Sequence, residues 1–368
     1  LRVSGQFDSV REVQELRLEV GGRVLRLGDV ARVFRGSIDP PVYTMRFGAR
    51  QAIGLGVSMA PSGDVIRLGE NLERTMQRLH EELPIGIEFA SFYSDLGAKV
   101  TVVEMLESIL PVEDAEVSAF MEKQLTKQGM TIHSKTGVQK LEATAKGVKA
   151  EIKFADGKVE TQDFSHAIVA IGIVPNVEDI GLETLGVKQL PNKHIETDGY
   201  GRTSVDGIWA IGDVTSGPWL AHKAMHEAVV CVEKMAGVKD VHALSTANIP
   251  GCTYSRPQVA SVGLTEAKAK EAGYKVKVGK FPFIGNGKAI ALGETEGFVK
   301  TVFDEATGEL LGAHMVGAEV TELIQGYVVA RELETTEAEL IGTTFPHPTL
   351  SEMMHESVLA AYGRPLHI

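Results

Sequence analysis

The stretch LPIGIEFASFYSDLGAKVTVVEM, residues Leu83 to Met105, decides how the rest of the chain is interpreted. Gly86 is followed by a helix-like run, then by Gly97, an apolar strand and Glu104. This order is typical of the second half of a βαβ unit that binds a dinucleotide, where the acid at the strand end accepts ribose hydroxyls. The opening strand and first two glycines do not precede Gly86, so the sequence predicts a truncated unit.

The bulk properties exclude several classes of function. The 368 residues are enough for two or three domains, and the net charge of −12 argues against nucleic acid or an anionic membrane surface as partner. No apolar run is long enough to span a membrane, and no signal peptide opens the chain, so we expect a cytoplasmic protein. The two cysteines, Cys231 and Cys252, fit neither a disulfide framework nor a CxxC motif.

Basic residues divide the chain into two parts. Residues 1–84 contain 12 Arg and no Lys, whereas residues 85–368 contain 21 Lys and 4 Arg. No fold requires such a division, because both residue types serve on any protein surface. Different coding origins for the two parts explain it more simply.

The first part predicts a small α+β fragment. Alternating residues around Gly21-Gly22 predict a hairpin over 16–27, with further strands at 31–36 and 52–59. Apolar residues at helical spacing from Val65 to Leu83 predict one amphipathic helix.

The second part predicts an α/β fold followed by an α+β unit. Helices are expected at 87–96, 114–128 and from Leu220, and strands at 99–104, 149–154, 158–163, 167–172 and 207–213. The expected fold class is therefore partial Rossmann-like layers plus a C-terminal α+β domain, preceded by the small fragment. The expected domains are 1–85, 86–165, 166–247 and 248–368.

Two acids follow predicted strands. Glu104 suits a ribose in NAD, although an acid at a strand end is more often a solvated cap. Asp213 ends the run GIWAIGD and could accept hydrogen bonds from a polyol, with a helix N-cap as an equal alternative.

The run FPHPTLSEMMHE, residues 345–356, carries the sharpest chemical signal. His347 lies between two prolines, and Glu352 follows five residues later in the first turn of a predicted helix, for which Thr349 and Ser351 are plausible caps. A carboxylate so close can orient an imidazole as an acid–base catalyst, and the alternative is a structural histidine in a proline-rich loop. His222, His226, His355 and Glu356 lack a third ligand at helical spacing, so no metal site is predicted.

From about Gly86 to Ile368 the chain resembles dihydrolipoamide dehydrogenase, a flavoprotein disulfide reductase of the 2-oxoacid dehydrogenase complexes. The resemblance rests on the quoted motifs together with ILPVEDAEVS, AIVAIGIVPN, WLAHKAMHEA, PQVASVGLTE and GELLGAHMVGAEVTELI. It implies an NAD site at Gly86, Glu88, Glu104, Val138 and Gly172. It implies an FAD site at Gly212, Asp213, Trp219, Leu220, Ala221 and His222. His347 and Glu352 would be the catalytic pair, acting in the partner subunit of a homodimer formed by residues 248–368, with lipoyl domains of the complexes as partners.

The family's FAD-binding domain, with its own GxGxxG and Cys-x4-Cys pair, has no counterpart in this sequence. Residues 1–84 instead resemble the periplasmic porter region of resistance–nodulation–division efflux pumps, through RVSGQFDSVREVQEL, GGRVLRLGDVARVFRG, the DPP at 39–41, AIGLGVSMAPSGDVIRLGENLE and ELPIGIE. Both resemblances include residues 85–88, which predicts a chimera joined there. None of the pump's membrane helices or proton-relay residues is present.

The expected activity is dihydrolipoyl dehydrogenase chemistry by family, with little or no turnover in this chain, because a thiol–disulfide relay needs a disulfide. One alternative is a non-enzymatic dimerisation module. The other is an efflux-pump fragment, which rests on residues 1–85 alone.

Overall fold

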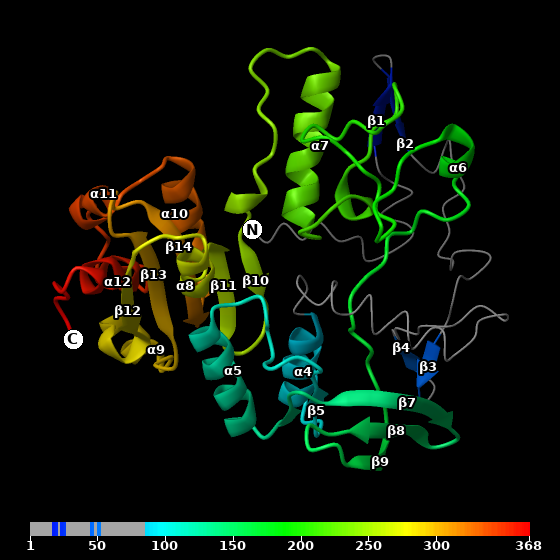
Figure 1. Cartoon of the computed structure of the whole chain (residues 1–368), viewed down its shortest axis with the longest axis horizontal. Helices are drawn as coiled ribbons and strands as arrows, with labels where there is room; N and C mark the ends of the chain where they lie inside the picture. The colour runs from blue at the N-terminus through cyan, green and yellow to red at the C-terminus, as the bar shows by residue number, and fades with distance from the viewer. Residues whose placement is uncertain (1–16, 21–22, 27–44, 48–49, 53–84) are drawn as a thin grey trace. The chain divides into compact units, whose positions relative to one another are not determined.

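The structure is a computed structural model that describes residues 17–20, 23–26, 45–47, 50–52 and 85–368. The chain divides into two compact units, Leu1–Ala60 and Pro61–Ile368, which are considered separately. Figure 1 labels the described elements and colours them from blue at the N-terminus to red at the C-terminus.

The described residues of the first unit form two antiparallel hairpins. Strands β1 (Arg17–Val20) and β2 (Arg23–Arg26) pair on either side of Gly21-Gly22, which confirms the predicted hairpin. Strands β3 (Met45–Phe47) and β4 (Arg50–Ala52) form a second hairpin that the sequence did not predict. The strand predicted at 31–36, the helix at 65–83 and most of the strand at 52–59 lie outside the described residues.

The second unit begins with the elements expected from the opening stretch. Helix α4 (Ile85–Asp95) ends before Gly97, whose φ of 88° is the left-handed conformation that favours glycine after a helix. Strand β5 (Thr101–Val103) pairs in parallel with β6 (Thr131–His133) through α5 (Ala115–Lys127). The Asp114 side chain caps α5 by accepting a hydrogen bond from the Glu116 backbone N–H.

An antiparallel sheet follows, with the strand order β7-β8-β9. Strands β8 (Gly147–Lys153) and β9 (Val159–Phe164) match the predicted hairpin around Asp156-Gly157. Strand β7 (Gly137–Thr144) was not predicted, because most of its side chains are exposed and its sequence has no apolar alternation.

Two predicted strands in the next segment are wrong. Residues 167–172 form no strand, and Ile168, Val169 and Ile171 are exposed. Residues 207–213 contribute one bridge, between Trp209 and Arg202, before a 3₁₀ turn, η1 (Gly212–Val214). A strand requires a hydrogen-bonded neighbour, and within the described residues neither run has one along its length. The short helix α6 (Leu182–Leu185) and the predicted helix α7 (Ala221–Met235) complete this segment.

Residues from 248 onward form the expected α+β unit. Its antiparallel sheet has the order β10-β11-β14-β13-β12. The strands are β10 (Gly251–Thr253), β11 (Gln258–Gly263), β12 (Val276–Pro282), β13 (Phe298–Asp304) and β14 (Leu310–Gly317). The 3₁₀ turns are η2 (Thr246–Asn248) and η3 (Phe283–Gly285). The helices are α8 (Glu266–Glu271), α9 (Gly287–Leu292), α10 (Val320–Glu332), α11 (Glu337–Gly342) and α12 (Glu352–Ala361).

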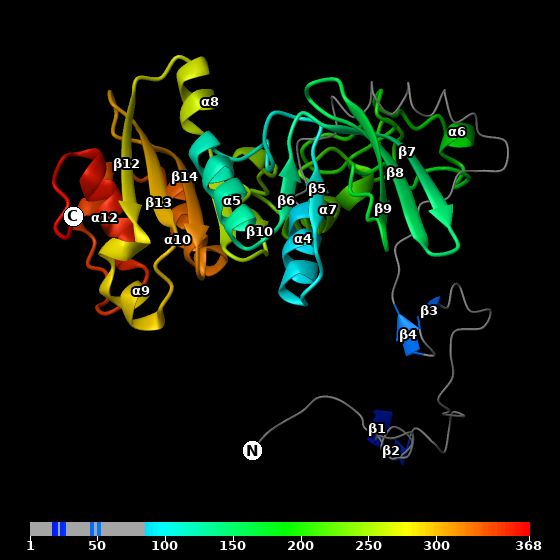
Figure 2. The ribbon, with the colours of Figure 1, turned by 90° about the horizontal axis from the view of Figure 1, so that it is seen from below.

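Helices cover both faces of this sheet, which explains why every residue of β13 and β14 is buried. On one face, Phe281, Val299 and Met315 pack with residues of α10 and α12. On the other, Val259, Phe298 and Val316 pack with apolar residues of α4 and α5 (Figures 1 and 2). The five-stranded sheet therefore lies between two apolar layers.

A buried lysine fastens α5 to the sheet. Lys300 of β13, with 2% of its side chain exposed, places Nζ 2.9 Å from Asp114 Oδ1 and 2.8 Å from Glu116 Oε1. It also lies 2.8 Å from Glu266 Oε2 at the start of α8. Three elements therefore meet at one ammonium group.

Candidate functional site

The loop before α12 brings the predicted acid–base pair together. His347 Nδ1 lies 2.9 Å from Glu352 Oε1, and the Thr349 backbone N–H donates to Glu352 Oε2 at 2.9 Å. Glu352 is the first residue of α12, so the helix places its carboxylate back toward the loop. The His347 side chain is 77% exposed and that of Glu352 is 22% exposed. The imidazole is thus held at one nitrogen and open at the other side.

The hydrogen bonds also set the charge of the pair. Burial acts to raise the pKa of Glu352, but the hydrogen bonds from Thr349 and His347 outweigh it and lower that pKa. Glu352 is therefore a carboxylate at neutral pH. Because a carboxylate only accepts hydrogen bonds, Nδ1 of His347 carries the proton of their bond, and Nε2 is left to exchange protons.

One of the two predicted caps of this helix is confirmed, in position only. Ser351 is the N-cap residue of α12, but its side chain makes no capping hydrogen bond. The Thr349 hydroxyl bonds instead to Pro346 O at 2.6 Å and to Ser351 Oγ at 2.8 Å. The two hydroxyl groups therefore form hydrogen bonds within the loop that carries His347, and not with the backbone N–H groups at the start of α12.

The predicted flavin-side residues gather where η1 meets α7. Gly212 adopts a φ of 77°, and Asp213 follows it with an exposed side chain. Leu220 is the N-cap residue of α7, and Ala221 and His222 are exposed in its first turn. The exposed carboxylate of Asp213 can accept hydrogen bonds from a polyol. The N-terminus of α7, a helix of 15 residues, favours an electron-rich group of the same ligand. Asp213 is not the N-cap of α7, which leaves its carboxylate available.

Two residues that the sequence analysis missed support this turn. Glu227 Oε2 accepts a hydrogen bond from Gly212 N–H at 2.8 Å, and its Oε1 lies 2.8 Å from Lys223 Nζ. Lys223 is buried and also donates to Thr215 Oγ1 and Ser216 O at 3.0 and 2.7 Å. The i,i+4 spacing on α7 was a visible signal for the ion pair, but not for its contact with Gly212.

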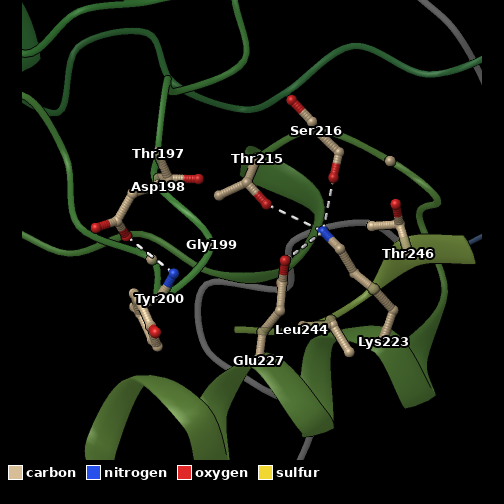
Figure 3. A pocket seen from close by; sticks show the side chains of 12 residues that line it. Thr197, Asp198, Gly199, Tyr200, Thr215, Ser216, Lys223, Glu227, Leu244 and Thr246 are labelled. Atoms are coloured by element: carbon tan, nitrogen blue, oxygen red, sulfur yellow. Dashed lines mark hydrogen bonds and ion pairs between the residues drawn. The ribbon is translucent and has the colours of Figure 1, made fainter. Parts of the chain in front are cut away.

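A cavity of about 180 Å³ lies beside this ion pair (Figure 3). Asp198, Tyr200, Thr215 and Leu244 are among its lining residues. Figure 3 shows the Lys223 ammonium between Thr215, Ser216 and Glu227. The three N–H groups of the ammonium are all used by these partners. Lys223 therefore holds Glu227 in place, and Glu227 binds the Gly212 N–H.

Trp219 packs beneath the start of α7. Its ring stacks on His194 with centroids 4.8 Å apart, and Nε1 donates to Thr215 O at 3.0 Å. Burial lowers the pKa of His194, so this ring is neutral. His222 is held on the other side, where Nε2 contacts Pro250 O at 2.9 Å. The segment 219–222 is therefore fixed at both ends.

The predicted NAD-side residues lie around α4, β5 and β7. A Cβ on Gly86 would stand 3.3 Å from Ala170 Cβ, so the glycine permits the close packing that the sequence predicted. Glu104 follows β5, and its Oε1 accepts a hydrogen bond from Leu106 N–H at 2.8 Å. Val138 is exposed on β7, and Gly172 has a φ of 104°.

Glu88 is committed to a structural contact. Its Oε1 accepts a hydrogen bond from Tyr254 N–H at 2.8 Å, which joins α4 to β10. Arg256 and Asp95 add an ion pair between the same regions. The contact is exposed, so Glu88 lies half-buried at the surface where α4 meets β10.

Neither cysteine is a reactive group. Cys231 and Cys252 are both free, and Cys231 is buried. Burial raises the pKa of Cys252 to about 11, so its thiol stays protonated. Among residues 17–20, 23–26, 45–47, 50–52 and 85–368, no group of His, Cys, Asp and Glu is arranged to hold a metal ion. None of the helices described there is both long and apolar enough to cross a membrane.

Comparison with known families divides the chain in three. Residues 84–228 match the pyridine nucleotide-disulphide oxidoreductase family, and residues 249–358 match its dimerisation domain. Residues 1–110 match the AcrB/AcrD/AcrF family. The first and third matches overlap over residues 84–110, which include the predicted junction.

Relatives with curated names agree with this division. The dihydrolipoyl dehydrogenase of Zymomonas mobilis is 65% identical over 283 residues, which are 77% of this chain and 60% of that protein. The dihydrolipoyl dehydrogenase of Rhizobium etli is 59% identical over 77% of this chain and 58% of its own length. The chain therefore spans about 60% of the length of the curated relatives it matches, and those relatives are oxidoreductases.

Solved structures show the same fold. LpdA from Mycobacterium tuberculosis superimposes with a TM-score of 0.69 at 28% identity, over 76% of this chain and 60% of that chain. The flavoprotein disulfide reductase RclA from Escherichia coli, in its Cu(II) complex, gives a TM-score of 0.70 at 24% identity, over 76% of this chain and 62% of its own. The latter likeness concerns the fold alone.

Proposed function

We propose that residues 86–368 are the acid–base and dimer-forming part of a dihydrolipoyl dehydrogenase, an enzyme that oxidises dihydrolipoamide with FAD and NAD. The observation that carries the proposal is the His347–Glu352 hydrogen bond of 2.9 Å at an exposed loop. The high identity to two dihydrolipoyl dehydrogenases supports it.

In this proposal His347 is the base that takes a proton from a substrate thiol. Its Nδ1–H is held by Glu352, so Nε2 has the free lone pair that a base needs. The carboxylate stabilises the imidazolium that forms after proton transfer. The 77% exposure of His347 fits a base that completes a site in a second copy of the chain.

The pyridine nucleotide-disulphide oxidoreductase family uses FAD and NAD. The residues present fit part of each cofactor, because Asp213 and the N-terminus of α7 are open while the Gly212 turn is firmly supported. Asp213 would bind the ribityl chain, residues 219–222 would lie by the flavin, and Glu104 would bind the NAD ribose. FAD, when bound, would supply the acceptor for electrons that leave a reduced enzyme disulfide, and would pass them to NAD.

We also propose that this 368-residue chain has little turnover and retains FAD weakly. Thiol–disulfide exchange needs an enzyme disulfide, and both cysteines of the sequence are free thiols, one of them buried. The test is flavin absorbance after purification with added FAD, together with lipoamide-dependent NADH formation. Bound flavin with turnover would contradict this part of the proposal.

The role of residues 86–368 is tested separately by transplantation. The 283 matched residues replace their counterparts in the Zymomonas mobilis enzyme, and lipoamide-dependent NADH formation is measured. We expect an active hybrid, in which His347→Gln lowers kcat by about 10²- to 10⁴-fold. A folded hybrid without activity, or an unaffected His347→Gln variant, would contradict the assignment.

The origin proposed for the chain is a chimera joined near residues 85–88. Its support is the division of Arg and Lys at residue 84 and the overlap of two family matches over residues 84–110. Long-read sequencing of the source locus tests this origin. An uninterrupted gene of the same arrangement in several related genomes would overturn it.

A second candidate function is a dimerisation module. The five-stranded sheet with helices on both faces is a complete core, which supports assembly without catalysis. Light scattering after size-exclusion chromatography tests this candidate, because a module of this kind must be a dimer and a monomer would exclude it. By the first proposal, that of a dihydrolipoyl dehydrogenase part, the protein is cytoplasmic, and lipoyl domains of 2-oxoacid dehydrogenase complexes are its partners.

A further inference from the structure

A buried asparagine lies behind the loop that carries His347. Asn286 sits between η3 and α9, and 5% of its surface is exposed. The preceding turn is anchored by Phe283, which is fully buried in the sheet core. Asn286 therefore projects from a rigid corner, 61 residues before His347 in the sequence.

Both ends of the Asn286 amide are used. Its Oδ1 accepts a hydrogen bond from Ala289 N–H at 2.9 Å, which caps α9. Its Nδ2 donates to the Thr349 backbone O at 3.0 Å. One side chain thus joins the start of α9 to the loop over 346–351.

The Thr349 contact leads directly to the acid–base pair. The N–H of the same residue donates to Glu352 Oε2 at 2.9 Å, and Glu352 Oε1 accepts from His347. Asn286 therefore binds the backbone carbonyl of Thr349, while Glu352 binds its backbone N–H. The loop is therefore fixed between a buried amide and the carboxylate that orients the base.

We propose that Asn286 is a positioning residue for His347, acting through Thr349 and Glu352. Its donor Nδ2 keeps Thr349 where its N–H reaches Glu352, and this contact keeps Oε1 directed at His347. The inference uses the proposed function only in naming His347 as the base. A purely structural alternative is that Asn286 serves α9 alone as its N-cap.

The substitution Asn286→Ser separates the two roles. Serine is as good an N-cap as asparagine, so α9 keeps its capping acceptor. Serine has no amide, and its oxygen ends one bond beyond Cβ, so the contact with Thr349 is lost. Asn286→Asp, which keeps the shape and replaces the donor by an oxygen facing Thr349 O, serves if the serine variant does not fold.

The matched control is Asn248→Ser. Asn248 also uses its amide between elements, with Nδ2 donating to Val328 O at 3.1 Å and to Glu332 Oε2 at 3.0 Å. These contacts lie at α10, so the control removes a comparable amide without touching the 346–351 loop.

The measurement is the rate of carbethoxylation of each histidine by diethyl pyrocarbonate near pH 6, read by peptide mass spectrometry on the full chain. This reagent modifies neutral imidazole, and a neighbouring carboxylate favours the protonated form. His242, which is exposed, provides the internal reference in every sample.

We expect the ratio of the His347 rate to the His242 rate to rise about two- to fivefold in Asn286→Ser, the range for loss of an exposed carboxylate–imidazole contact. It should stay unchanged in Asn248→Ser. An unchanged ratio in a folded Asn286 variant would overturn the proposal and leave only the cap. The readout needs no turnover, so an inactive enzyme would not decide the question.

Discussion

Replacing Lys300 by methionine tests what holds α5 and α8 to the sheet. The lysine is buried, and its ammonium meets Asp114, Glu116 and Glu266 at 2.8–2.9 Å. Methionine fills most of the same volume without charge. The substitution therefore leaves three carboxylates without their shared cation while the apolar packing changes little.

The expected cost follows from the exposure of each carboxylate. Asp114 is 4% exposed, whereas Glu116 and Glu266 are 45% and 29% exposed. The two glutamates keep Lys280 and Lys270 as partners, so their loss is small. Asp114 keeps only its cap bond to Glu116 N–H, and leaving a buried charge unpaired costs about 3–5 kcal/mol.

The dependence on pH has a definite sign. Hydrogen bonds from Lys270 and Lys300 lower the pKa of Glu266 below its ordinary 4.5. For Glu116, burial acts to raise the pKa, but hydrogen bonds from Lys280 and Lys300 lower it overall. A depressed pKa contributes stability above the ordinary value that is lost as the pH falls through the folded value. The part of the difference between parent and variant that comes from Glu116 and Glu266 should therefore shrink below about pH 4.5.

The assay is urea unfolding followed by circular dichroism at pH 7. Lys127→Met is the matched control, because Lys127 also joins α5 to a neighbouring segment through Glu296, with side chains 65% and 54% exposed. We expect the control substitution to lower the free energy of unfolding by less than about 1 kcal/mol. Adding Asp114→Asn to Lys300→Met should recover at least half of the loss, since the unpaired charge is then gone. Equal costs for Lys300→Met and Lys127→Met would refute the reasoning.

Three further predictions concern buried contacts of the second unit. Gly279→Ala should destabilise the fold by about 1–3 kcal/mol or more, because the added Cβ would lie 1.8 Å from Ser357 O of α12. The measurement is thermal unfolding, and the control is Gly287→Ala, whose added Cβ meets nothing within 4 Å. Glu227→Gln should lower the free energy of unfolding in urea by about 3 kcal/mol, because Lys223 stays buried without its carboxylate partner. Glu233→Gln, at an exposed position of the same helix, should change it very little, and equal effects of the two substitutions would contradict this prediction. Burial raises the pKa of Glu113 to about 7 despite a hydrogen bond from Ser261, so the parent should lose about 2 kcal/mol between pH 5 and pH 8 as this group ionises in the folded state. Glu113→Gln should abolish that loss, and a loss of the same size in the variant would exclude Glu113 as its source.

Local signals predicted much of the second unit. Helices α4, α5 and α7 followed from apolar spacing and caps, and the hairpin of β8 and β9 from Asp-Gly. The His347–Glu352 contact was also predictable, because five residues across a helix start leave little freedom of distance. What these features share is that all their determinants lie within a few residues of one another.

The features that the sequence did not predict depend on residues that lie far apart in the chain. The run 167–172 is as apolar as a buried strand, yet a strand depends on its neighbour, which is set elsewhere in the chain. The support of Gly212 by Glu227 spans 15 residues, and that of Thr349 by Asn286 spans 63. One sequence contains no record of such pairings, because many asparagines and glutamates could serve equally well.

The same distinction explains which chemistry this chain keeps. The proposed acid–base pair and the support of its loop lie wholly within residues 283–352, beside one core built on the five-stranded sheet. A phosphate-binding site of the expected kind needs a strand, a glycine loop and a helix from consecutive segments, and only the helix, α4, follows residue 84. The junction proposed at 85–88 would therefore leave the proposed base oriented while it divides the proposed cofactor site. Because proton transfer and cofactor binding depend on separate segments, an oriented His347 is expected even in a preparation that contains no flavin.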